Sequence, residues 1–154
     1  MRTIITFKVL GEPEPQGSTT TYVRAGKAHT TSANKNLKSW RNDVAEAAER
    51  AMRLHGAQKI AKGRAVRLEL HFTFSRLSGH FGKRGLLASA PIHKTTKPDL
   101  SKLVRAIEDS LVDAGVMIDD NQVTEIGTSK HWGDYNGAAV TVIDLDVLEE
   151  AEAA

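Results

Sequence analysis

Residues 93–123 read HKTTKPDLSKLVRAIEDSLVDAGVMIDDNQV, and this stretch decides more about the fold than any other part of the chain. Its apolar side chains recur at positions i, i+3, i+4, i+7 and i+11, which places them on one side of a helix. That side would pack against a core, and Gly115 would end the helix. The members of the stripe are Leu100, Leu103, Val104, Ile107 and Leu111.

Carboxylates stand at both ends of this predicted helix. Asp99 comes directly before it, and Asp119 and Asp120 follow it. An Asp at a helix start is often only a cap, and paired Asp residues often only make a turn. Basic residues crowd the first turns, however, and phosphodiester hydrolysis uses cation-binding carboxylates beside groups that hold phosphate. The helix spans about 24 Å, so Asp120 would approach Asp99 only if the next strand returned beside the helix start.

The rest of the chain alternates between strand and helix patterns. Apolar and polar residues alternate most clearly over 66–74, and a helical pattern covers 33–55. Ala25-Gly26 would turn a short hairpin, and residues 134–137 would join two further strands at 122–132 and 138–147 as a second hairpin. With a strand at 2–10, the sequence predicts an α/β or α+β fold. Its small mixed sheet would have about four to six strands, packed with two main helices.

Composition limits the class of protein. The 154 residues suffice for one domain with a real core, predicted over residues 1–148, followed by a frayed acidic tail at 149–154. No apolar run approaches the roughly 20 residues that span a membrane, so no membrane contact is expected. The lack of cysteine excludes disulfides and thiolate metal sites, and it suits a cytoplasmic protein. No glycine-rich nucleotide loop is present, so no nucleotide cofactor is expected.

Charge is divided unevenly along the chain. Residues 1–105 carry 20 Lys or Arg against 7 Asp or Glu, a net +13, whereas residues 106–154 carry 1 against 12, a net −11. A basic portion of this size attracts polyanions such as nucleic acid, although an uneven solvated surface is the alternative. Many of the cations lie in glycine-containing loops that can follow a DNA backbone. The residues predicted to bind DNA are Arg24, Lys27, Lys83, Arg84, Lys94, Lys97 and Lys102.

KPDLSKLVRAIEDSL followed by DDNQV resembles the RusA-type Holliday junction resolvases, small endonucleases of phages and prophages. The resemblance extends more weakly to the N-terminal GEPEPQGS loop and to the strand before the basic loop at 76–97. It implies Mg²⁺, with Mn²⁺ as a plausible substitute, held by an acidic cluster. It also implies a homodimer that makes paired nicks in four-way junctions or related branched DNA.

The resemblance carries over residue by residue to three predicted catalytic residues. Asp99 matches the first essential aspartate of the family, Asp120 matches the last, and Arg105 occupies the position of a functional lysine. Ser101 stands where the second aspartate usually sits, which is a departure from the family pattern. The predicted metal ligands are therefore Asp99, Ser101, Asp119 and Asp120.

A metal that loses one carboxylate binds less tightly unless water or another acid replaces it. Asp119, Glu69 and Glu108 are the candidates for that replacement, with Asp119 first. Two functions follow from the sequence. The first is a Mg²⁺-dependent endonuclease that resolves Holliday junctions during recombination and repair. The second is a non-catalytic branched-DNA-binding protein of the same fold, weakened by Ser101.

Overall fold

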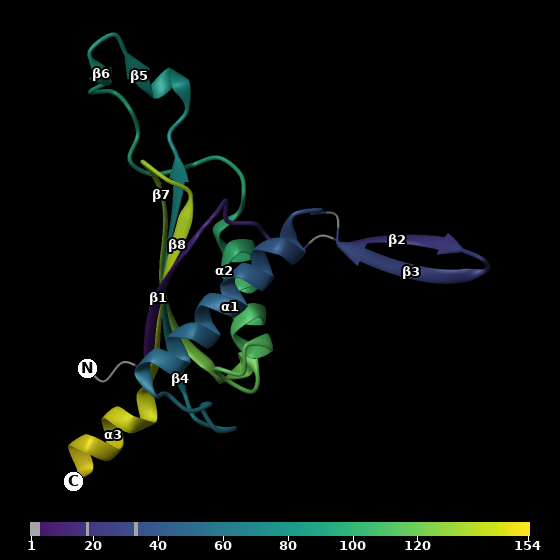
Figure 1. Ribbon diagram of the computed structural model, residues 1–154, viewed down its shortest axis with the longest axis vertical. Helices are drawn as coiled ribbons and strands as arrows, with labels where there is room; N and C mark the ends of the chain where they lie inside the picture. The colour runs from purple at the N-terminus through teal and green to yellow at the C-terminus, as the bar shows by residue number, and fades with distance from the viewer. Residues whose placement is uncertain (1–3, 18, 33) are drawn as a thin grey trace.

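The computed structural model describes residues 4–17, 19–32 and 34–154, and its main sheet has four strands (Figure 1). They lie in the order β1-β8-β4-β7. Strand β4 runs parallel to β7 and antiparallel to β8, which in turn pairs antiparallel with β1. The mixed sheet expected from the sequence is thus confirmed. Its strands are β1 (Ile5–Leu10), β4 (Val66–Ser75), β7 (Val123–Gly133) and β8 (Gly137–Asp144).

Two long helices, α1 (Leu37–His55) and α2 (Leu100–Asp113), lie side by side on one face of this sheet (Figure 1). Helix α1 begins later than the predicted residue 33, which lies outside the described residues. Residues 34–36 form a turn in which the Asn34 side chain accepts a hydrogen bond from the Asn36 amide. Of the helices in the described residues, none is long and apolar enough to cross a bilayer.

The core lies between the helices and the sheet. In β4 every second side chain, from Val66 to Phe74, is buried against the helices, whereas the residues between them face the open side of the sheet. The apolar stripe of α2 is confirmed, since Leu103, Ile107 and Leu111 are fully buried. Because burial of this stripe fixes the rotation of α2 about its axis, it also fixes which polar residues of the helix face solvent.

Strands β7 and β8 do not form the predicted hairpin. Strand β4 lies between them and pairs with both, so the 134–137 segment crosses over the end of β4. The Asn136 side chain accepts a hydrogen bond from the Ser75 amide, and Gly133 O accepts one from the Arg76 amide. The apolar inner face of β4 explains why β4 is central and the hairpin is not formed. In the middle of the sheet this face lies fully under the helices, whereas at an edge it would be partly exposed.

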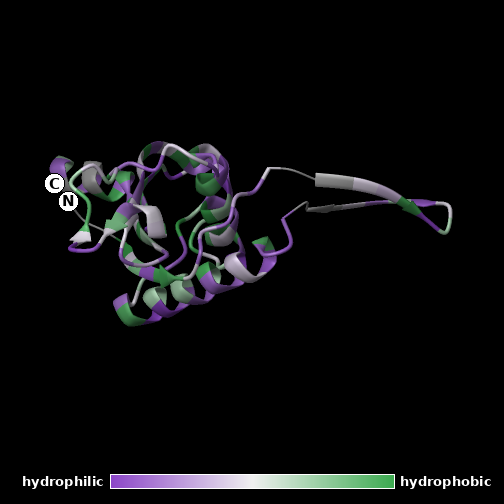
Figure 2. Ribbon diagram, turned by 90° about the horizontal axis from the view of Figure 1, so that it is seen from above, coloured by the Kyte–Doolittle hydropathy of each residue, from purple (hydrophilic) through white to green (hydrophobic). Residues whose placement is uncertain are grey.

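The other predicted hairpin, which turns at Ala25-Gly26, is confirmed, and it stands away from the body (Figures 1 and 2). Strands β2 (Thr19–Arg24) and β3 (Lys27–Ser32) pair antiparallel, and Ala25 and Gly26 form the two-residue turn. Both turn residues have positive φ, 55° and 75°, the combination of a type I′ turn. We call this hairpin the arm. The shorter elements of the chain are η1 (Ser78–His80), β5 (Phe81–Gly82), β6 (Gly85–Leu86) and η2 (Asp120–Gln122).

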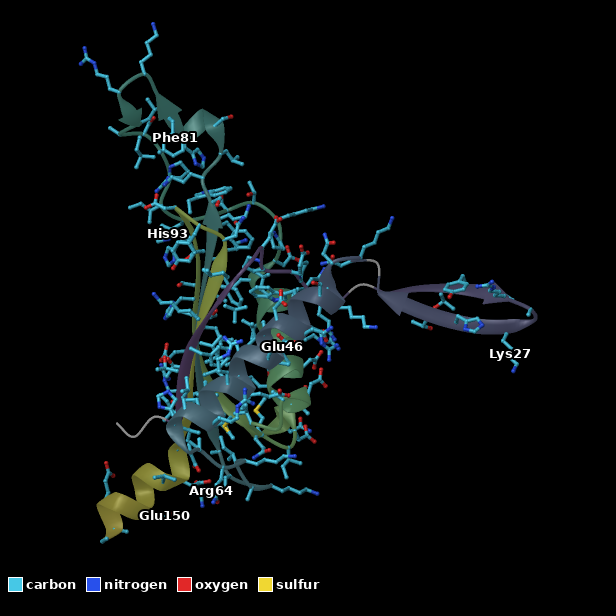
Figure 3. All side chains as sticks on the ribbon, viewed as in Figure 1. Lys27, Glu46, Arg64, Phe81, His93 and Glu150 are labelled. Carbon is cyan, nitrogen blue, oxygen red and sulfur yellow. The ribbon has the colours of Figure 1, made fainter. Side chains whose placement is uncertain are left out.

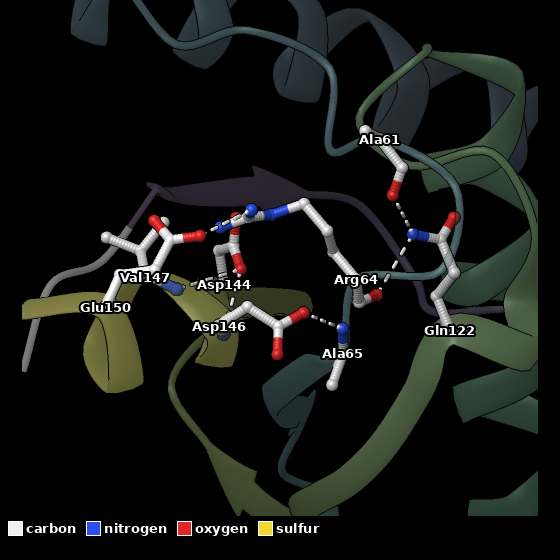
Figure 4. Close-up of polar contacts among 8 residues, drawn as sticks. All are labelled: Ala61, Arg64, Ala65, Gln122, Asp144, Asp146, Val147 and Glu150. Atoms are coloured by element: carbon white, nitrogen blue, oxygen red, sulfur yellow. Dashed lines mark hydrogen bonds and ion pairs between the residues drawn. The ribbon is translucent and has the colours of Figure 1, made fainter. Parts of the chain in front are cut away.

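The C-terminal residues form helix α3 (Leu145–Ala153) where the sequence predicted a strand to residue 147 and a frayed tail at 149–154. Asp144 caps this helix, accepting hydrogen bonds from the amides of Asp146 and Val147. Arg64 binds the Asp144 carboxylate at 2.9 Å and that of Glu150 at 3.0 Å (Figure 4). The cap is local, but the ion pairs come from Arg64, 80 positions before Asp144, which is why the tail pattern alone did not predict a helix.

Truncating the α2 stripe should destabilise the whole fold. We expect Ile107→Ala to lower the free energy of unfolding by about 2–5 kcal/mol, because a fully buried side chain leaves a cavity. Leu54→Ala is the control, since that leucine of α1 is 80% exposed; its effect should stay within about 0.5 kcal/mol. Urea denaturation of both variants measures the difference. Equal midpoints for both variants would contradict the packing described for α2.

Candidate active site

Asp99 lies at the N-terminus of α2 without acting as a side-chain cap. Its carboxylate makes no capping hydrogen bond and is 63% exposed, and its nearest cation is the Lys102 ammonium at 3.5 Å. Pro15, Gly17, Lys97 and Pro98 line the same surface depression. The capping alternative therefore does not describe this side chain, which is left available for a ligand.

Lys130 fixes the segment that precedes Asp99. Its ammonium, on β7, donates hydrogen bonds to the carbonyl oxygens of Thr96 and Pro98 at 2.8 and 2.7 Å. Sequence reasoning missed this role, although one signal was present. Lys130 is the only Lys or Arg after residue 105, in an otherwise acidic part of the chain.

Asp119 and Asp120 lie together at the other end of α2. Asp119 accepts a hydrogen bond from the Asn121 amide at 2.9 Å, and Asp120 begins the short helix η2. The segment is not extended throughout, because residues 120–122 are helical, and the two carboxyl groups lie close enough to shift each other's pKa. The Asn121 amide lowers the pKa of Asp119, and the neighbouring Asp119 carboxyl raises the pKa of Asp120. Such a pair holds a proton or a cation more readily than a lone carboxylate.

Glu108 and Asp109 extend this acidic turn along α2. Burial, followed by repulsion from Asp120 and Asp109, raises the pKa of the half-buried Glu108. Asp109 is 4.0 Å from the guanidinium of Arg41, which binds Asp113 at 2.5 Å. Arg41 thus compensates Asp109 and Asp113, whereas Asp119, Asp120 and Glu108 make no ion pair within 4.0 Å among the described residues. We call these three residues the acidic turn.

The structure does not bring Asp99 and Asp120 together within one chain. Asp99 precedes the first residue of α2, whereas Asp120 interacts with Asp109 in its third turn, about 15 Å further along the axis. Among the described residues, no group of three or more His, Asp or Glu side chains is arranged to hold a metal ion. One chain alone therefore does not supply the predicted ligand set of Asp99, Ser101, Asp119 and Asp120.

The remaining candidates are divided between the two faces of the sheet. Ser101 and Arg105 are exposed on α2, between the Asp99 end and the acidic turn, so Arg105 lies on the path that joins them. Glu108 lies at the acidic turn, as described above. Glu69 faces the open side of the sheet, where Arg67 donates hydrogen bonds to it, and it is remote from α2. Of the three acids proposed to replace the missing aspartate, Asp119 and Glu108 are thus near Asp120 and Glu69 is not.

The residues predicted to bind DNA lie on the arm, where Figure 3 labels Lys27, on the β5–β6 hairpin and near the start of α2. Arg24 and Lys27 flank the turn of the arm, and Lys83 and Arg84 form the turn of the β5–β6 flap. Lys97 and Lys102 line the depression beside Asp99. Lys94 is engaged elsewhere, because its ammonium lies 4.2 Å from the centre of the Trp132 ring. Burial there, followed by the nearby Lys130, lowers the pKa of Lys94.

Gln122 holds the acidic turn in place, and Figure 4 shows its hydrogen bonds to Ala61 and Arg64. This side chain is 7% exposed and uses all of its hydrogen-bonding groups. Its Nε2 donates to the carbonyl oxygens of Ala61 and Arg64, and its Oε1 accepts from the amides of Ile118 and Asp119. Sequence analysis missed this residue as well, because the carbonyl groups that bind its Nε2 lie about 60 positions away. The local signal was the spacing of Asp119 and Gln122, which matches a capping box.

Removing these hydrogen bonds should loosen the turn. We expect Gln122→Leu to lower the free energy of unfolding by about 2–4 kcal/mol, because four backbone groups lose their partner in a buried place. Gln58→Leu, at an exposed position, is the matched control. Urea denaturation measures both variants. A Gln122→Leu protein as stable as the Gln58→Leu protein would show that these hydrogen bonds do not hold the turn.

The chain was also compared with known proteins. No curated protein matches it. The model of one family, endodeoxyribonuclease RusA, matches residues 11–143, which cover most of the chain and include every candidate residue described above. That family in general comprises Holliday junction resolving endonucleases. The chain therefore belongs to the RusA endodeoxyribonuclease family.

Proposed function

We propose that this protein is a Mg²⁺-dependent, structure-selective endonuclease that resolves four-way DNA junctions as a homodimer. Mn²⁺ would substitute for Mg²⁺. The observation that carries the proposal is the placement of exposed carboxylates at the two ends of α2, with a free strand edge beside them. A second copy in the opposite orientation would unite what one chain keeps apart.

Strand β7 offers the edge for such a dimer. It is the outermost strand of the sheet, and the 92–94 segment covers only its last part, through hydrogen bonds at Lys130 and Trp132. Residues 123–129 keep a free edge among the described strands, and free edges favour pairing with another strand. Ile126 faces the helix side there, beside the buried Leu68, yet is 42% exposed. This exposed apolar residue on an unpaired edge supports an interface.

If two β7 edges paired antiparallel about a two-fold axis, the α2 helices of the two copies would run in opposite directions. The acidic turn of one copy would then lie beside the Asp99 end of the other. The charges suit this contact, because Lys97, Lys102 and Lys130 surround Asp99 while Glu108, Asp119 and Asp120 form the opposite end. Two equivalent sites would form, as paired nicking of a two-fold symmetric junction requires.

Each residue of the united site has a distinct task. Asp99 of one copy and Asp119 and Asp120 of the other would hold the metal through oxygen ligands, which Mg²⁺ prefers. A bound Mg²⁺ supplies an activated water and neutralises charge on the leaving oxygen. The exposed guanidinium of Arg105 would bind the scissile phosphate through two oxygens. The products would carry 5′-phosphate and 3′-hydroxyl ends.

Ser101 supports a second candidate function. A hydroxyl stands where the family pattern has a carboxylate, and no acid of the described residues replaces it beside Asp99 within the chain. The alternative is a protein that binds branched DNA without cutting it. A labelled four-way junction incubated with and without Mg²⁺ separates the two, because only the endonuclease would release nicked duplexes.

Asp99→Asn and Asp120→Asn should each abolish cleavage while preserving junction binding, because each removes a ligand and a charge that repels phosphate. Mixing the two inactive variants tests the shared site. In a mixed dimer one site would carry both substitutions and the other neither. We therefore expect nicking to return to about a quarter of the parental rate after subunit exchange. Gel analysis of a labelled junction measures both effects.

The control for the mixing experiment is a variant that cannot form the dimer. Ile126→Glu places a charge on the free edge and should lower the mass seen by light scattering to that of one chain. Combined with each Asn substitution, it should prevent rescue. Lack of rescue between two dimeric variants that exchange subunits would refute the shared site, and cleavage by Asp99→Asn or Asp120→Asn alone would refute the assigned residue.

Restoring the carboxylate should strengthen metal binding. We expect Ser101→Asp to lower the Mg²⁺ concentration for half-maximal cleavage by about tenfold, because an added anionic oxygen stabilises a bound divalent cation. Ser101→Asn adds a similar volume without charge and should leave that concentration nearly unchanged. Initial cleavage rates over a Mg²⁺ titration provide the measurement. An unchanged Mg²⁺ requirement in Ser101→Asp would place the metal away from this end of α2.

A further inference from the structure

The arm carries two different faces. Tyr22 and His29 stack across the strands, with ring centres 5.4 Å apart, and Arg24 and Lys27 continue the same face toward the turn. On the opposite face Thr21 and Thr30 lie across from one another, and Val23 follows them. Every residue from 21 to 30 is exposed, so both faces are open to solvent.

An isolated two-stranded hairpin is only marginally stable in water, so the arm gains order from a partner. The charge of the arm indicates what kind. Residues 19–32 contain Arg24 and Lys27 and no Asp or Glu. The Lys27 side chain points away from the body at the tip (Figure 3). A purely cationic ribbon with hydroxyl and aromatic side chains fits a polyanion, and its small apolar content does not suit a protein surface.

The root of the arm is tied to the Asp99 end of α2. The Gln16 amide donates a hydrogen bond to the Lys102 carbonyl oxygen at 3.0 Å. Pro15 and Gly17 line the depression that also contains Asp99. The arm thus starts beside one half of the candidate site, and its six-residue strands carry the tip about 20 Å outward.

We propose that the arm lies in the major groove of one duplex arm of the junction. Its tip would hold the backbone about six base pairs from the phosphate at Asp99, since 20 Å corresponds to that many 3.4 Å steps. A two-stranded ribbon has the width that the groove admits. Arg24 and Lys27 contact phosphates, and the arm therefore measures duplex length beside the branch point. This inference rests on the proposed function and adds a requirement for duplex that cleavage itself does not impose.

Junctions with duplex arms of about 4 and about 12 base pairs test the inference, because only the longer arms reach the tip. Fluorescence anisotropy in EDTA measures binding without cleavage. We expect the parent protein to bind the long-armed junction about tenfold more tightly. Arg24→Gln combined with Lys27→Gln should abolish this preference. Lys83→Gln combined with Arg84→Gln should weaken binding to both junctions and retain the preference.

Hydroxyl-radical footprinting gives a second readout that does not depend on affinity. The parent should protect the backbone about six base pairs from the cut, and the Arg24/Lys27 double variant should lose only that protection. Equal preference for long arms in parent and double variant would overturn the inference, as would a parent with no preference. Suppose the double variant keeps the preference for long duplex arms but changes its mass in light scattering. The arm would then contact the partner subunit and not the DNA, and the inference would be overturned. Failure of the parent to bind any junction would refute the proposed function itself.

Discussion

Strand β4 is the constraint on which the arrangement of the site depends. Its inner face is apolar throughout and its neighbours β7 and β8 flank it on both sides. Because β7 runs parallel to β4, the chain must cross from one end of the sheet to the other between them, and α2 makes that crossing. The crossing separates Asp99 from Asp120 by most of a helix, and it leaves β7 as an edge. The separation of Asp99 from Asp120 and the free edge of β7 thus have the same cause, which is the position of β4.

Electrostatics gives the two ends of α2 different properties. The Asp99 end is surrounded by lysines, two of which are already engaged, Lys102 with Asp99 and Lys130 with backbone carbonyl groups. The opposite end concentrates carboxyl groups, where burial and then repulsion raise the pKa of Glu108, and the neighbouring Asp119 carboxyl raises the pKa of Asp120. An end that repels phosphate and an end that attracts it are individually poor places for hydrolysis. Brought together, the carboxylates would hold a metal ion and the lysines would attract the phosphate, and a metal-dependent nuclease requires both.

Local patterns predicted most elements, and long-range pairing accounts for what they missed. Alternation located β4, the apolar stripe located α2, and Ala25-Gly26 located the turn of the arm. The strand order could not be predicted, because hydrophobic alternation in β7 and β8 is the same whether they pair with each other or with β4. The candidate residues of 97–123 were found through their motif. The distances between them were not predicted. Nor were the supporting roles of Gln122 and Lys130, each of which donates hydrogen bonds to carbonyl groups remote in sequence.

The strand order also governs when the chain can fold during synthesis. Among the described strands, β1 pairs in the main sheet with β8 alone, so β1 waits for residues 137–144 to leave the ribosome. Strand β4 likewise has no partner until β7 emerges after residue 123. Residues up to 122 are therefore made before any described main-sheet hydrogen bond can form, and the apolar face of β4 stays exposed meanwhile. A nascent chain of this topology depends on α1 or on a chaperone to cover that face until β7 and β8 have left the ribosome.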